Sequence, residues 1–224
     1  MSLAKDPYLE HRQKWLRFSP TELDSILVQQ RLQALGSEVE WPNPHLEPMV
    51  GQRIKTTARR SAVAIILRDQ PDFPLLLTRR SFKIRFGGQW CFPGGREAVS
   101  DDSLRDAAVR ETEEEIGLSA QDLTWLGCMG HYYTQSGFLI EAHVFKAMPD
   151  CLCRLNADEV SELIEIPLKV LQNPDHYRII GRGLGRANFQ FRWQSVQVGG
   201  PTVSLLIHLM RCLNDAGLSH DRIA

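Results

Sequence analysis

The chain has 224 residues, of which 43% are hydrophobic and 24% are charged. This length fits one domain with an extension rather than two full domains, and the composition excludes collagen-like, coiled-coil and wholly disordered chains. The 26 basic and 27 acidic residues give a formal net charge of -1. No positive excess is therefore available for binding nucleic acid through bulk charge.

The N-terminal quarter is predicted to form a helical extension followed by a proline-rich connector. Behind a Ser-Pro helix start, apolar residues recur at helical spacing from Leu23 to Leu35. Three prolines within residues 41–48 then exclude both a helix and a central strand. We therefore expect the extension and connector over residues 1–57 and the main domain, with a C-terminal helix, over residues 58–224.

The main domain shows short apolar runs bounded by turn residues, which are typical of strands, together with longer segments of helical character. The predicted strands cover residues 62–67, 75–78, 90–92, 123–129 and 138–145. The predicted helices cover residues 101–116, 159–171 and 203–213. The first of these helices is strongly indicated, because it begins at acidic residues and a serine, contains no glycine or proline, and ends at a glycine.

The cysteines and the apolar runs bear on the compartment. The five cysteines are scattered, without zinc-finger spacing, and we expect reduced thiols, with Cys151 and Cys153 as ordinary strand residues. The start of the chain carries charges in place of an apolar leader, and no apolar run approaches the roughly 20 residues of a membrane span. These features predict a cytoplasmic protein without a membrane partner.

Three carboxylates are predicted to share one face of the helix over residues 101–116. At 100° per residue, Glu111, Glu114 and Glu115 fall within an arc of about 100°. Like charges this close repel, and a hard divalent cation would compensate them because it binds carboxylate oxygens. Arg110 is placed to hold Glu111 through a charge-assisted hydrogen bond. By themselves, however, three glutamates on a helix are more typical of a solvated acidic patch.

The residues before this helix favour the metal site. A short strand ends in Phe92-Pro-Gly-Gly95, and a glycine pair lets the backbone approach a ligand and offer a carbonyl to a metal. The segment from Gly95 to Leu118 resembles the Nudix box of the Nudix hydrolases, G-x5-E-x7-R-E-U-x-E-E-x-G-U with U aliphatic. Its second half departs only at Thr112. Its first half is one residue longer, with Asp101 or Asp102 in place of the first glutamate.

A neighbouring set of residues resembles the coenzyme A diphosphatase branch of this family. The segment from Leu76 to Gly95 is similar to the signature LLTxRSx3Rx3Gx3FPGG, although it is one residue shorter before FPGG. The longer Nudix box with an aspartate is also typical of the branch. Further similarity lies in Thr134–Phe138 and Asp158–Leu168, whereas Gly199-Gly200 replaces the Trp-Gly expected before the last helix.

The resemblance implies the Nudix fold, an α/β/α sandwich with a mixed sheet, and metal-dependent hydrolysis of a diphosphate linked to a nucleoside. It implies that Mg²⁺ or Mn²⁺ is held by Glu111, Glu114, Glu115 and the Gly95 carbonyl. It also implies catalytic roles for Glu114, Glu115 and Arg110. Dimerisation is common in the family, so a homodimer is expected.

The general base and the substrate contacts are further expectations. Glu159, placed just before a predicted helix, is expected to act as base or additional ligand, with Asp158 as the second candidate and a first-turn acid as the alternative. Four cations near the glycine pair are expected to grip the phosphates of the substrate: Arg79, Arg80, Lys83 and Arg85. The alternative for these cations is the charged edge of a strand in solvent.

Histidines and aromatic residues in the predicted strands complete the candidates. His131 and His143 are expected to be structural. Trp90, Tyr132 and Tyr133 carry faces that can stack on adenine, but we expect at least two of the three to pack in the core.

The sequence leaves the substrate open within one chemical class. The leading prediction is coenzyme A, a small-molecule nucleotide, cleaved to 3',5'-ADP and 4'-phosphopantetheine. ADP-ribose or a dinucleotide such as NADH is the alternative substrate. A non-catalytic nucleotide sensor is the alternative from another class, although such a domain has no reason to retain costly carboxylates on one helix face.

Overall fold

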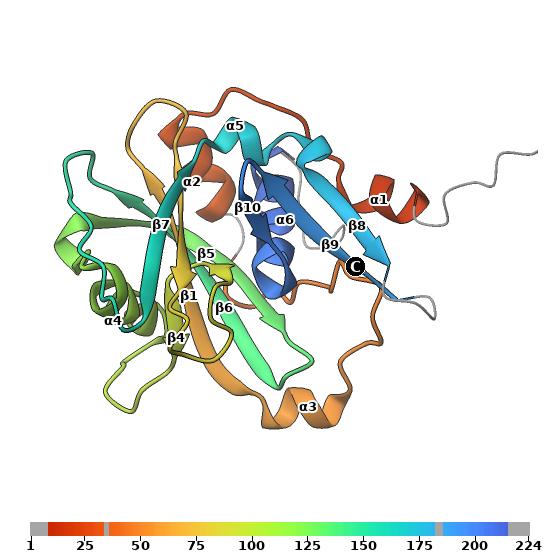
Figure 1. The fold of residues 1–224 in the computed structure, drawn as a ribbon, viewed down its shortest axis with the longest axis horizontal. Coiled ribbons are helices and arrows are strands. Elements are labelled where there is room, and N and C mark those ends of the chain that lie inside the picture. The colour runs from red at the N-terminus through yellow and green to blue at the C-terminus, as the bar shows by residue number, and fades with distance from the viewer. Residues whose placement is uncertain (1–8, 34–35, 182–185, 215–224) are drawn as a thin grey trace, which may run out of the picture.

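The structure of the protein is a computed structural model that describes residues 9–33, 36–181 and 186–214 (Figure 1). A central mixed sheet separates two layers. Helix α4 covers one face of the sheet, and helix α6 lies on the other side together with a small second sheet. This arrangement confirms the predicted α/β/α sandwich.

Seven strands form the central sheet. They are β1 (Arg59–Arg68), β2 (Leu75–Arg80), β3 (Trp90–Cys91), β4 (Gly94–Arg96), β5 (Leu123–Tyr133), β6 (Phe138–Ala147) and β7 (Val160–Ile166). The order is β3-β2-β1-β6-β5, with β7 beside β2 and β4 beside β1. Strands β1 and β6 are parallel and the other pairs are antiparallel.

Strands β1 and β2 pair only at one end and then diverge. Their single register pair joins Leu67 to Leu75. Beyond it, β3 pairs with the free edge of β2, and β4 pairs with the free edge of β1, where Ala62 stands opposite Gly95. The divergence therefore brings the glycine pair, Gly94 and Gly95, into the middle of the sheet.

The side chains of β1 alternate between two cores. Ala62, Ala64 and Ile66 are buried against α4 (Leu104–Ile116), while Ile65 and Leu67 belong to the core on the opposite face. The small alanines allow the helix to lie close to the sheet. Its predicted bounds are close to those observed, since Ser103 accepts a hydrogen bond from the Asp106 backbone at the start.

The opposite face carries α6 (Gly200–Asn214), α2 (Ser25–Gln33) and a three-stranded antiparallel sheet. The strands of this second sheet are β8 (Tyr177–Gly181), β9 (Ala187–Trp193) and β10 (Val196–Val198). The sequence analysis assigned no element to these strands. In β9 alternate residues, Phe189 and Phe191, are fully buried, so its inward face completes the core around α6.

The N-terminal region packs onto this second core. It contains α1 (Leu9–Trp15), α2 and α3 (Gln52–Thr57). Helix α2 begins later than the Ser-Pro signal predicted, because Asp24 accepts a hydrogen bond from the Leu27 backbone at 2.7 Å; the end of the predicted helix, residues 34–35, lies outside the described residues. Trp15, Leu32 and Trp41 are core residues. They share one core with residues after position 57. The division of the chain at residue 57 stays a prediction.

The helix predicted over residues 159–171 is wrong for most of its length. Residues Val160–Ile166 form β7, which pairs with β2 along the full length of that strand. Only Leu168–Leu171 is helical, as the single turn α5 after Pro167. Pairing with an open strand edge outweighs the helical spacing of the apolar residues. The remaining short elements are the 3-10 turns η1 (Ala120–Asp122) and η2 (Pro174–His176).

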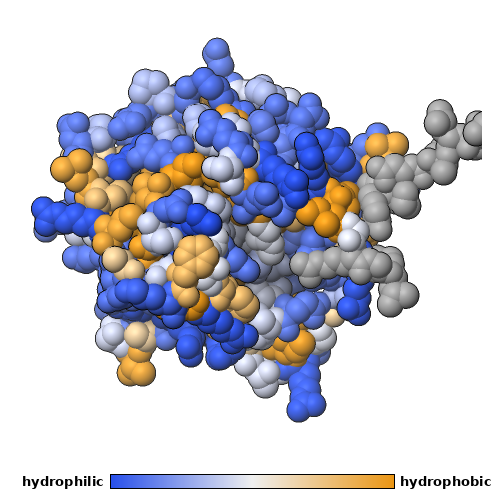
Figure 2. Space-filling model, in the orientation of Figure 1, coloured by the Kyte–Doolittle hydropathy of each residue, from blue (hydrophilic) through white to orange (hydrophobic). Residues whose placement is uncertain are grey.

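The surface seen in Figure 2 is mainly hydrophilic, and its hydrophobic side chains gather mostly on the left half of the view, with smaller groups elsewhere. Among the helices of the described part of the chain, none has the length and apolar character needed to cross a membrane.

Candidate active site

A cleft of about 570 Å³ opens where β1 and β2 diverge. It is bordered by strands of the central sheet, by the glycine pair and by α4. The carboxylates that line it are Glu111, Glu115 and Glu159. The arginines that line it are Arg59, Arg80, Arg85 and Arg96. Acidic and basic groups thus face one hollow, as a site for a metal ion and a phosphate ester requires.

Both glycines of the pair are required by their surroundings. A Cβ atom on Gly95 would lie 2.3 Å from Cδ of Glu111, and a Cβ atom on Gly94 would lie 2.3 Å from the Ala62 carbonyl oxygen. Gly94 also has a φ of 150°, which L side chains rarely adopt. The absence of side chains here lets the Glu111 carboxylate lie directly against the backbone of β4.

Glu115 is the most deeply buried acid of the cleft. It is 4% exposed, and its Oε2 atom has no hydrogen-bond partner among the described residues. Burial raises the pKa of Glu115 to about 8, with a further upward contribution from the charge of Glu111 and an opposing hydrogen bond from the Gly94 backbone. A buried, unpartnered carboxylate oxygen is costly, and a cation in the cleft would compensate it.

Glu111 lies beside Glu115 in the cleft. Burial raises the pKa of Glu111 as well, although hydrogen bonding to Arg110 opposes the change. The charge of Glu159 raises the pKa of both acids. The three carboxylates therefore repel one another across the space that they line.

Arg110 holds the helix acids in place from one side. It donates to both carboxylate oxygens of Asp101, at 2.9 and 3.1 Å, and to Glu111 at 2.9 Å. Hydrogen bonding to Arg110 lowers the pKa of Asp101. Of the two aspartates that the sequence left open, Asp101 is thus the partner of Arg110, while Asp102 is exposed. Because Asp101 holds the Arg110 guanidinium in place, Arg110 orients Glu111 towards the cleft.

Glu114 differs from the other two helix acids. Its side chain is 50% exposed, and its carboxylate is held by Arg110 at 3.2 Å. It does not belong to the residues that line the cleft. The structure therefore brings Glu111 and Glu115 together, as predicted from the helix face, and leaves Glu114 paired with the arginine.

The two candidate bases lie in different environments. Glu159 lines the cleft, directly before strand β7 rather than before a helix, and its backbone carbonyl accepts a 2.7 Å hydrogen bond from Ser81. Asp158 is exposed and pairs with Lys83 at 2.7 Å, which lowers the pKa of Asp158. The geometry favours Glu159 over Asp158 as a group that faces the substrate.

The four predicted phosphate-binding cations divide into two pairs. Arg80 and Arg85 line the cleft. Arg79 instead donates to Glu162 at 2.6 Å, and Lys83 is paired with Asp158. Arg79 and Arg80 point to different sides because side chains alternate along β2. The ion pairs with Glu162 and Asp158 then occupy Arg79 and Lys83 outside the cleft.

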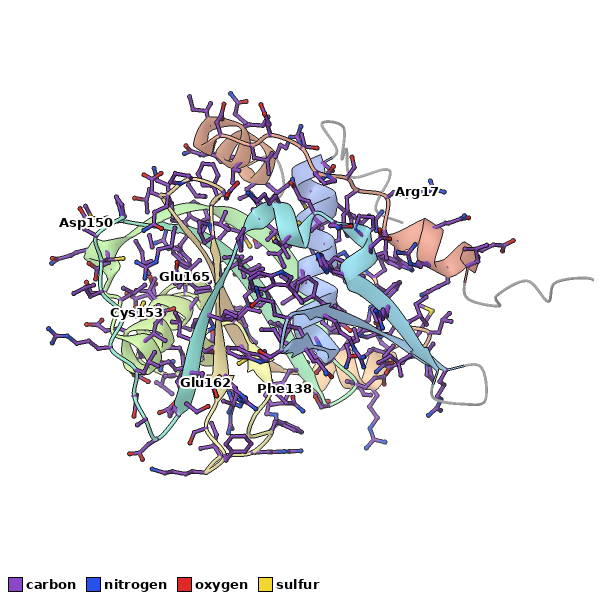
Figure 3. All side chains as sticks on the ribbon, turned by 45° about the horizontal axis from the view of Figure 1, so that its top comes forward. Arg17, Phe138, Asp150, Cys153, Glu162 and Glu165 are labelled. Atoms are coloured by element: carbon purple, nitrogen blue, oxygen red, sulfur yellow. The ribbon has the colours of Figure 1, made fainter. Side chains whose placement is uncertain are left out.

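Two cleft arginines were missed by sequence reasoning. Arg59 stands at the start of β1, with its guanidinium 4.1 Å from the ring centre of Phe138, and Arg96 ends β4. No sequence signal marked the first, because Arg59 meets Phe138, labelled in Figure 3, only through the parallel pairing of β1 with β6.

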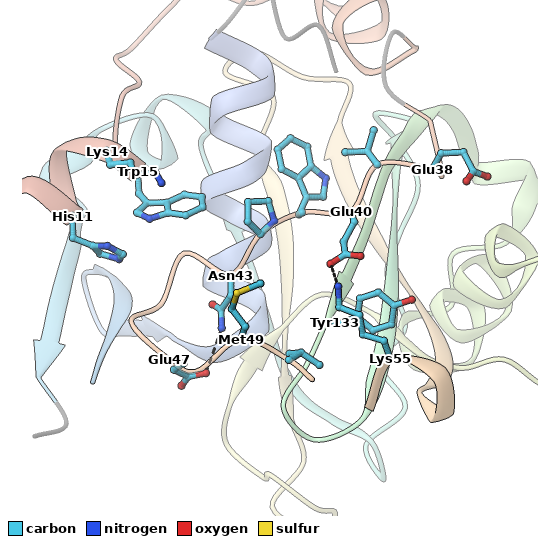
Figure 4. Close-up of a pocket in the computed structure, with 14 residues that line it drawn as sticks. His11, Lys14, Trp15, Glu38, Glu40, Asn43, Glu47, Met49, Lys55 and Tyr133 are labelled. Carbon is cyan, nitrogen blue, oxygen red and sulfur yellow. Dashed lines mark hydrogen bonds and ion pairs between the residues drawn. The ribbon is translucent and has the colours of Figure 1, made fainter. Parts of the chain in front are cut away.

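The aromatic residues of the cleft are also not those considered from the sequence. Phe86 and Phe138 line it. Tyr132 is a core residue, 3% exposed, and Trp90 packs against the same core. Tyr133 lines a separate pocket of about 610 Å³ between α1, the connector and α3 (Figure 4). A Glu40–Lys55 ion pair closes one side of that pocket, with Lys55 over the Tyr133 ring.

The donor groups of the cleft fit a hard divalent cation. Carboxylate oxygens of Glu111 and Glu115 and the carbonyl of Gly95 are the oxygen ligands that Mg²⁺ and Mn²⁺ prefer. The unpartnered Oε2 of Glu115 and the close approach of the Glu111 carboxylate to the Gly95 backbone are both consistent with an ion at this position.

Comparison with known proteins shows the family to which this chain belongs. Residues 58–180 match the family profile of the NUDIX domain, which covers more than half of the chain. The chain therefore belongs to the Nudix hydrolase family, and the prediction of an enzyme of this family is confirmed. Nudix hydrolases generally use divalent metal ions such as Mg²⁺ or Mn²⁺.

Two relatives share more than the domain itself. The protein named "Uncharacterized Nudix hydrolase NudL" of Yersinia pestis (strain Pestoides F) is 29% identical over 176 residues, which are 77% of this chain and 88% of that protein. The protein of the same name from Yersinia pseudotuberculosis serotype O:1b (strain IP 31758) has the same identity and coverage.

Similar solved structures include an Ap4A hydrolase of C. elegans in a binary complex. It has a TM-score of 0.43 and 22% identity, over 49% of this chain and 80% of that chain. The NUDIX domain of Shewanella oneidensis NrtR complexed with ADP ribose has a TM-score of 0.40 and 20% identity, over 53% and 79%.

Proposed function

We propose that the protein hydrolyses the diphosphate bond of a nucleoside diphosphate derivative in the presence of Mg²⁺ or Mn²⁺, and that its substrate is coenzyme A or a derivative of it. The observation that supports this most directly is the cleft itself, in which the carboxylates of Glu111, Glu115 and Glu159 face four arginines. The products are 3',5'-ADP and 4'-phosphopantetheine, formed by addition of one water molecule across the phosphorus–oxygen bond.

The residues that would hold the ion are Glu111, Glu115 and the carbonyl of Gly95. Glu114, whose exposed carboxylate is held by Arg110, would be a further ligand. When bound, a divalent ion supplies positive charge that stabilises the phosphoryl oxygens as the bond breaks.

The remaining steps belong to side chains of the cleft. Glu159 accepts a proton from the attacking water as general base. Arg110 keeps Glu111 oriented through the hydrogen-bond network with Asp101. Arg110 and Glu111 are fixed before substrate arrives, which reduces the cost of reaching the transition state.

The arginines account for the choice of coenzyme A. A diphosphate and a 3'-phosphate together carry several negative charges, and the four arginines can bind them through paired N–H donors. Arg80 and Arg85, from the segment that resembles the coenzyme A diphosphatase signature, lie beside Phe86 in the cleft. Phe86 is 56% exposed and is available to stack on adenine.

Substrate comparison tests this proposal. The protein is incubated with Mg²⁺ and, in turn, coenzyme A, 3'-dephospho-coenzyme A, ADP-ribose and NADH, and products are identified by mass spectrometry. We expect kcat/KM for coenzyme A to exceed that for the dephospho form by about 10-fold, because a charge-assisted phosphate contact is lost. Equal turnover of the two would contradict the coenzyme A proposal, and higher turnover of ADP-ribose or NADH would assign the alternative substrate.

A sensing role would give a different result. Nucleotide binding in calorimetry with no product formed from any of the four compounds would identify a non-catalytic domain.

The proposal also includes a cytoplasmic homodimer. Light scattering during gel filtration would show twice the mass of 25.5 kDa if the protein is a dimer.

A further inference from the structure

A second group of metal-ligand side chains lies outside the cleft. Among the described residues, Cys128 of β5 and Glu141 and His143 of β6 each offer one ligand atom, and these atoms all lie within 4.8 Å of one another. None of the three lines the cleft. They combine a thiol, an imidazole and a carboxylate, whereas the cleft offers oxygen ligands.

The pairing of β5 with β6 brings these residues together. Cys128 stands opposite His143 in the antiparallel ladder, so their side chains share one face of the sheet. Glu141 is on the same face because it is two residues from His143, while Ala142 between them points into the opposite core. The register of β5 shifts between Cys128 and His131, which locally bends the strand.

The environment of His143 points to an absent ligand. His143 is 4% exposed, and within the described residues neither of its ring nitrogens makes a hydrogen bond. Its Nε2 atom lies 2.9 Å from Oε1 of Glu141, but without hydrogen-bond geometry. A buried polar group without a partner costs about 1 to 3 kcal/mol, so such a group indicates an unseen partner.

Burial of the other two ligands is also suited to a metal site. Cys128 is 7% exposed, and the side chain of Glu141 is 17% exposed. The cluster is therefore closed on the protein side and opens to solvent at the carboxylate. A metal ion can enter from that side and keep one position for water.

We propose that Cys128, Glu141 and His143 bind a Zn²⁺ ion. Thiolate, imidazole and carboxylate are the ligand types of protein zinc sites, whereas Mg²⁺ prefers oxygen ligands alone. Zinc–ligand bonds of about 2.0 to 2.3 Å need the three ligand atoms to approach somewhat more closely, by side-chain movement of about 1 Å. On binding, Cys128 releases its thiol proton to solvent and forms the sulfur–zinc bond, with no change of oxidation state.

The position of this cluster gives the ion a structural role. It joins the edge strand β5 to β6 at the point where their register shifts. In the same row of the sheet, Glu141 pairs with Ala62 and Ala62 pairs with Gly95. The zinc site is thus two strands from the catalytic glycine, about 10 Å away at ordinary strand spacing. It would hold the sheet on which the cleft is built, without contributing to the cleft.

Cobalt spectroscopy tests the site without relying on activity. Co²⁺ replaces Zn²⁺ with similar ligands and gives a charge-transfer absorption only when a thiolate binds it. We expect this absorption on adding one equivalent of Co²⁺ to metal-free protein, and its loss on adding Zn²⁺. Glu115→Gln, which alters the cleft, should leave the absorption unchanged.

Two serine variants locate the thiolate. Cys128→Ser should abolish the absorption and weaken Zn²⁺ binding by about 100-fold or more. Cys151→Ser is the matched control, because this half-buried thiol lies beside Arg68, away from the cluster, and its loss should change neither measurement. Absence of the absorption in the wild-type protein, or its persistence in Cys128→Ser, would overturn the proposal.

A second variant covers the case in which Cys128→Ser does not fold. Glu141→Gln keeps the thiol and the imidazole and changes only the partly exposed ligand. We expect it to fold, as judged by circular dichroism, and to bind Zn²⁺ at least about 10-fold more weakly. Unchanged zinc affinity in this variant would indicate that His143 and Glu141 form an ordinary polar pair, and would contradict the site.

Discussion

The two faces of the central sheet differ in what they bury. On one face, α6 buries a continuous apolar surface against α2 and the second sheet. Two polar side chains in that core contact backbone carbonyls: the Tyr177 hydroxyl donates to Leu171 at 2.9 Å, and Nε2 of His208 lies 3.1 Å from the Pro42 oxygen, while Nδ1 of His208 has no partner among the described residues. On the other face, α4 buries carboxylates, and Glu115 retains an oxygen without a partner.

This difference separates stability from chemistry. The α6 face contributes hydrophobic burial, while the α4 face carries charged groups at a cost that a bound cation offsets. Changes on the two faces should therefore have opposite effects. Those near α6 should lower stability and leave the chemistry intact, and those near Glu115 should do the reverse.

The largest expected loss of stability comes from the α6 face. Leu206 is fully buried, and Leu206→Ala should lower the free energy of unfolding by about 3 to 5 kcal/mol because it leaves a cavity. Urea titration measures this change. Below the unfolding transition, kcat should stay within about twofold of the wild-type value. A loss of kcat in the folded variant would break the proposed separation.

The largest expected loss of activity comes from the α4 face. Glu115→Gln should lower kcat/KM by more than about 100-fold, roughly 2.7 kcal/mol of transition-state stabilisation, because the cleft loses a metal ligand. Steady-state kinetics with Mg²⁺ measure it. Glu113→Gln is the control, since Glu113 is an exposed acid on the same helix. Equal rates for Glu115→Gln and Glu113→Gln would refute the role of Glu115.

The two faces should also respond differently to pH. Burial raises the pKa of Glu115 from an ordinary value of 4.5 to about 8, so the folded state favours the protonated acid. Stability without divalent ions should therefore fall as pH rises from about 4.5 to 8, by up to about 1.4 kcal/mol per pH unit. Urea titrations in EDTA test this, and Glu115→Gln should flatten the slope. An unchanged slope in the variant would assign the effect to other groups.

The opposite change of stability with pH is expected from His208, a buried residue of α6. Burial lowers its pKa from 6.5 to about 3, so the folded state favours the neutral ring. Stability should decrease as pH falls from about 6.5 towards 3, because the unfolded chain takes up the proton first. Nuclear magnetic resonance of the ring should show no protonation of His208 at pH 5 in the folded protein. A titration of its signals near pH 6.5 would contradict the assignment.

The smallest effect is expected from a cation that the structure places outside the cleft. Lys83→Ala removes an exposed partner of Asp158 and should change KM by less than about twofold. Arg85→Ala, two residues further along the same loop but lining the cleft, should raise KM about 10-fold. Substrate titrations compare the two. A larger effect for Lys83→Ala than for Arg85→Ala would reverse the assignment of the phosphate contacts.

The parts of the molecule that the sequence predicted well depend on local signals. Helix α4 has its own N-cap at Ser103 and its own terminal glycine, and the spacing of Glu111 and Glu115 follows from helical geometry alone. The glycine pair was recognisable because two glycines after a strand end let the backbone approach a ligand, and in the structure a Cβ atom on Gly95 would collide with Glu111.

The parts that were missed depend on distant partners. Strand β7 is extended because it pairs with β2, although residues 159–171 alone suggest a helix. The convergence of Arg59 and Phe138 in the cleft follows from the parallel pairing of β1 with β6, which no local pattern specifies. The division of the cations was set by Glu162 and Asp158, acids far along the chain.

The most direct test of the account is anomalous X-ray diffraction from crystals soaked in Mn²⁺. The account predicts an anomalous peak bound by the carboxylates of Glu111 and Glu115 and the carbonyl of Gly95. The peak should be missing from Glu115→Gln crystals treated in the same way. The crystals are then dissolved and the protein is assayed with Mn²⁺. An active protein whose cleft showed no Mn²⁺ in the crystal would contradict the account.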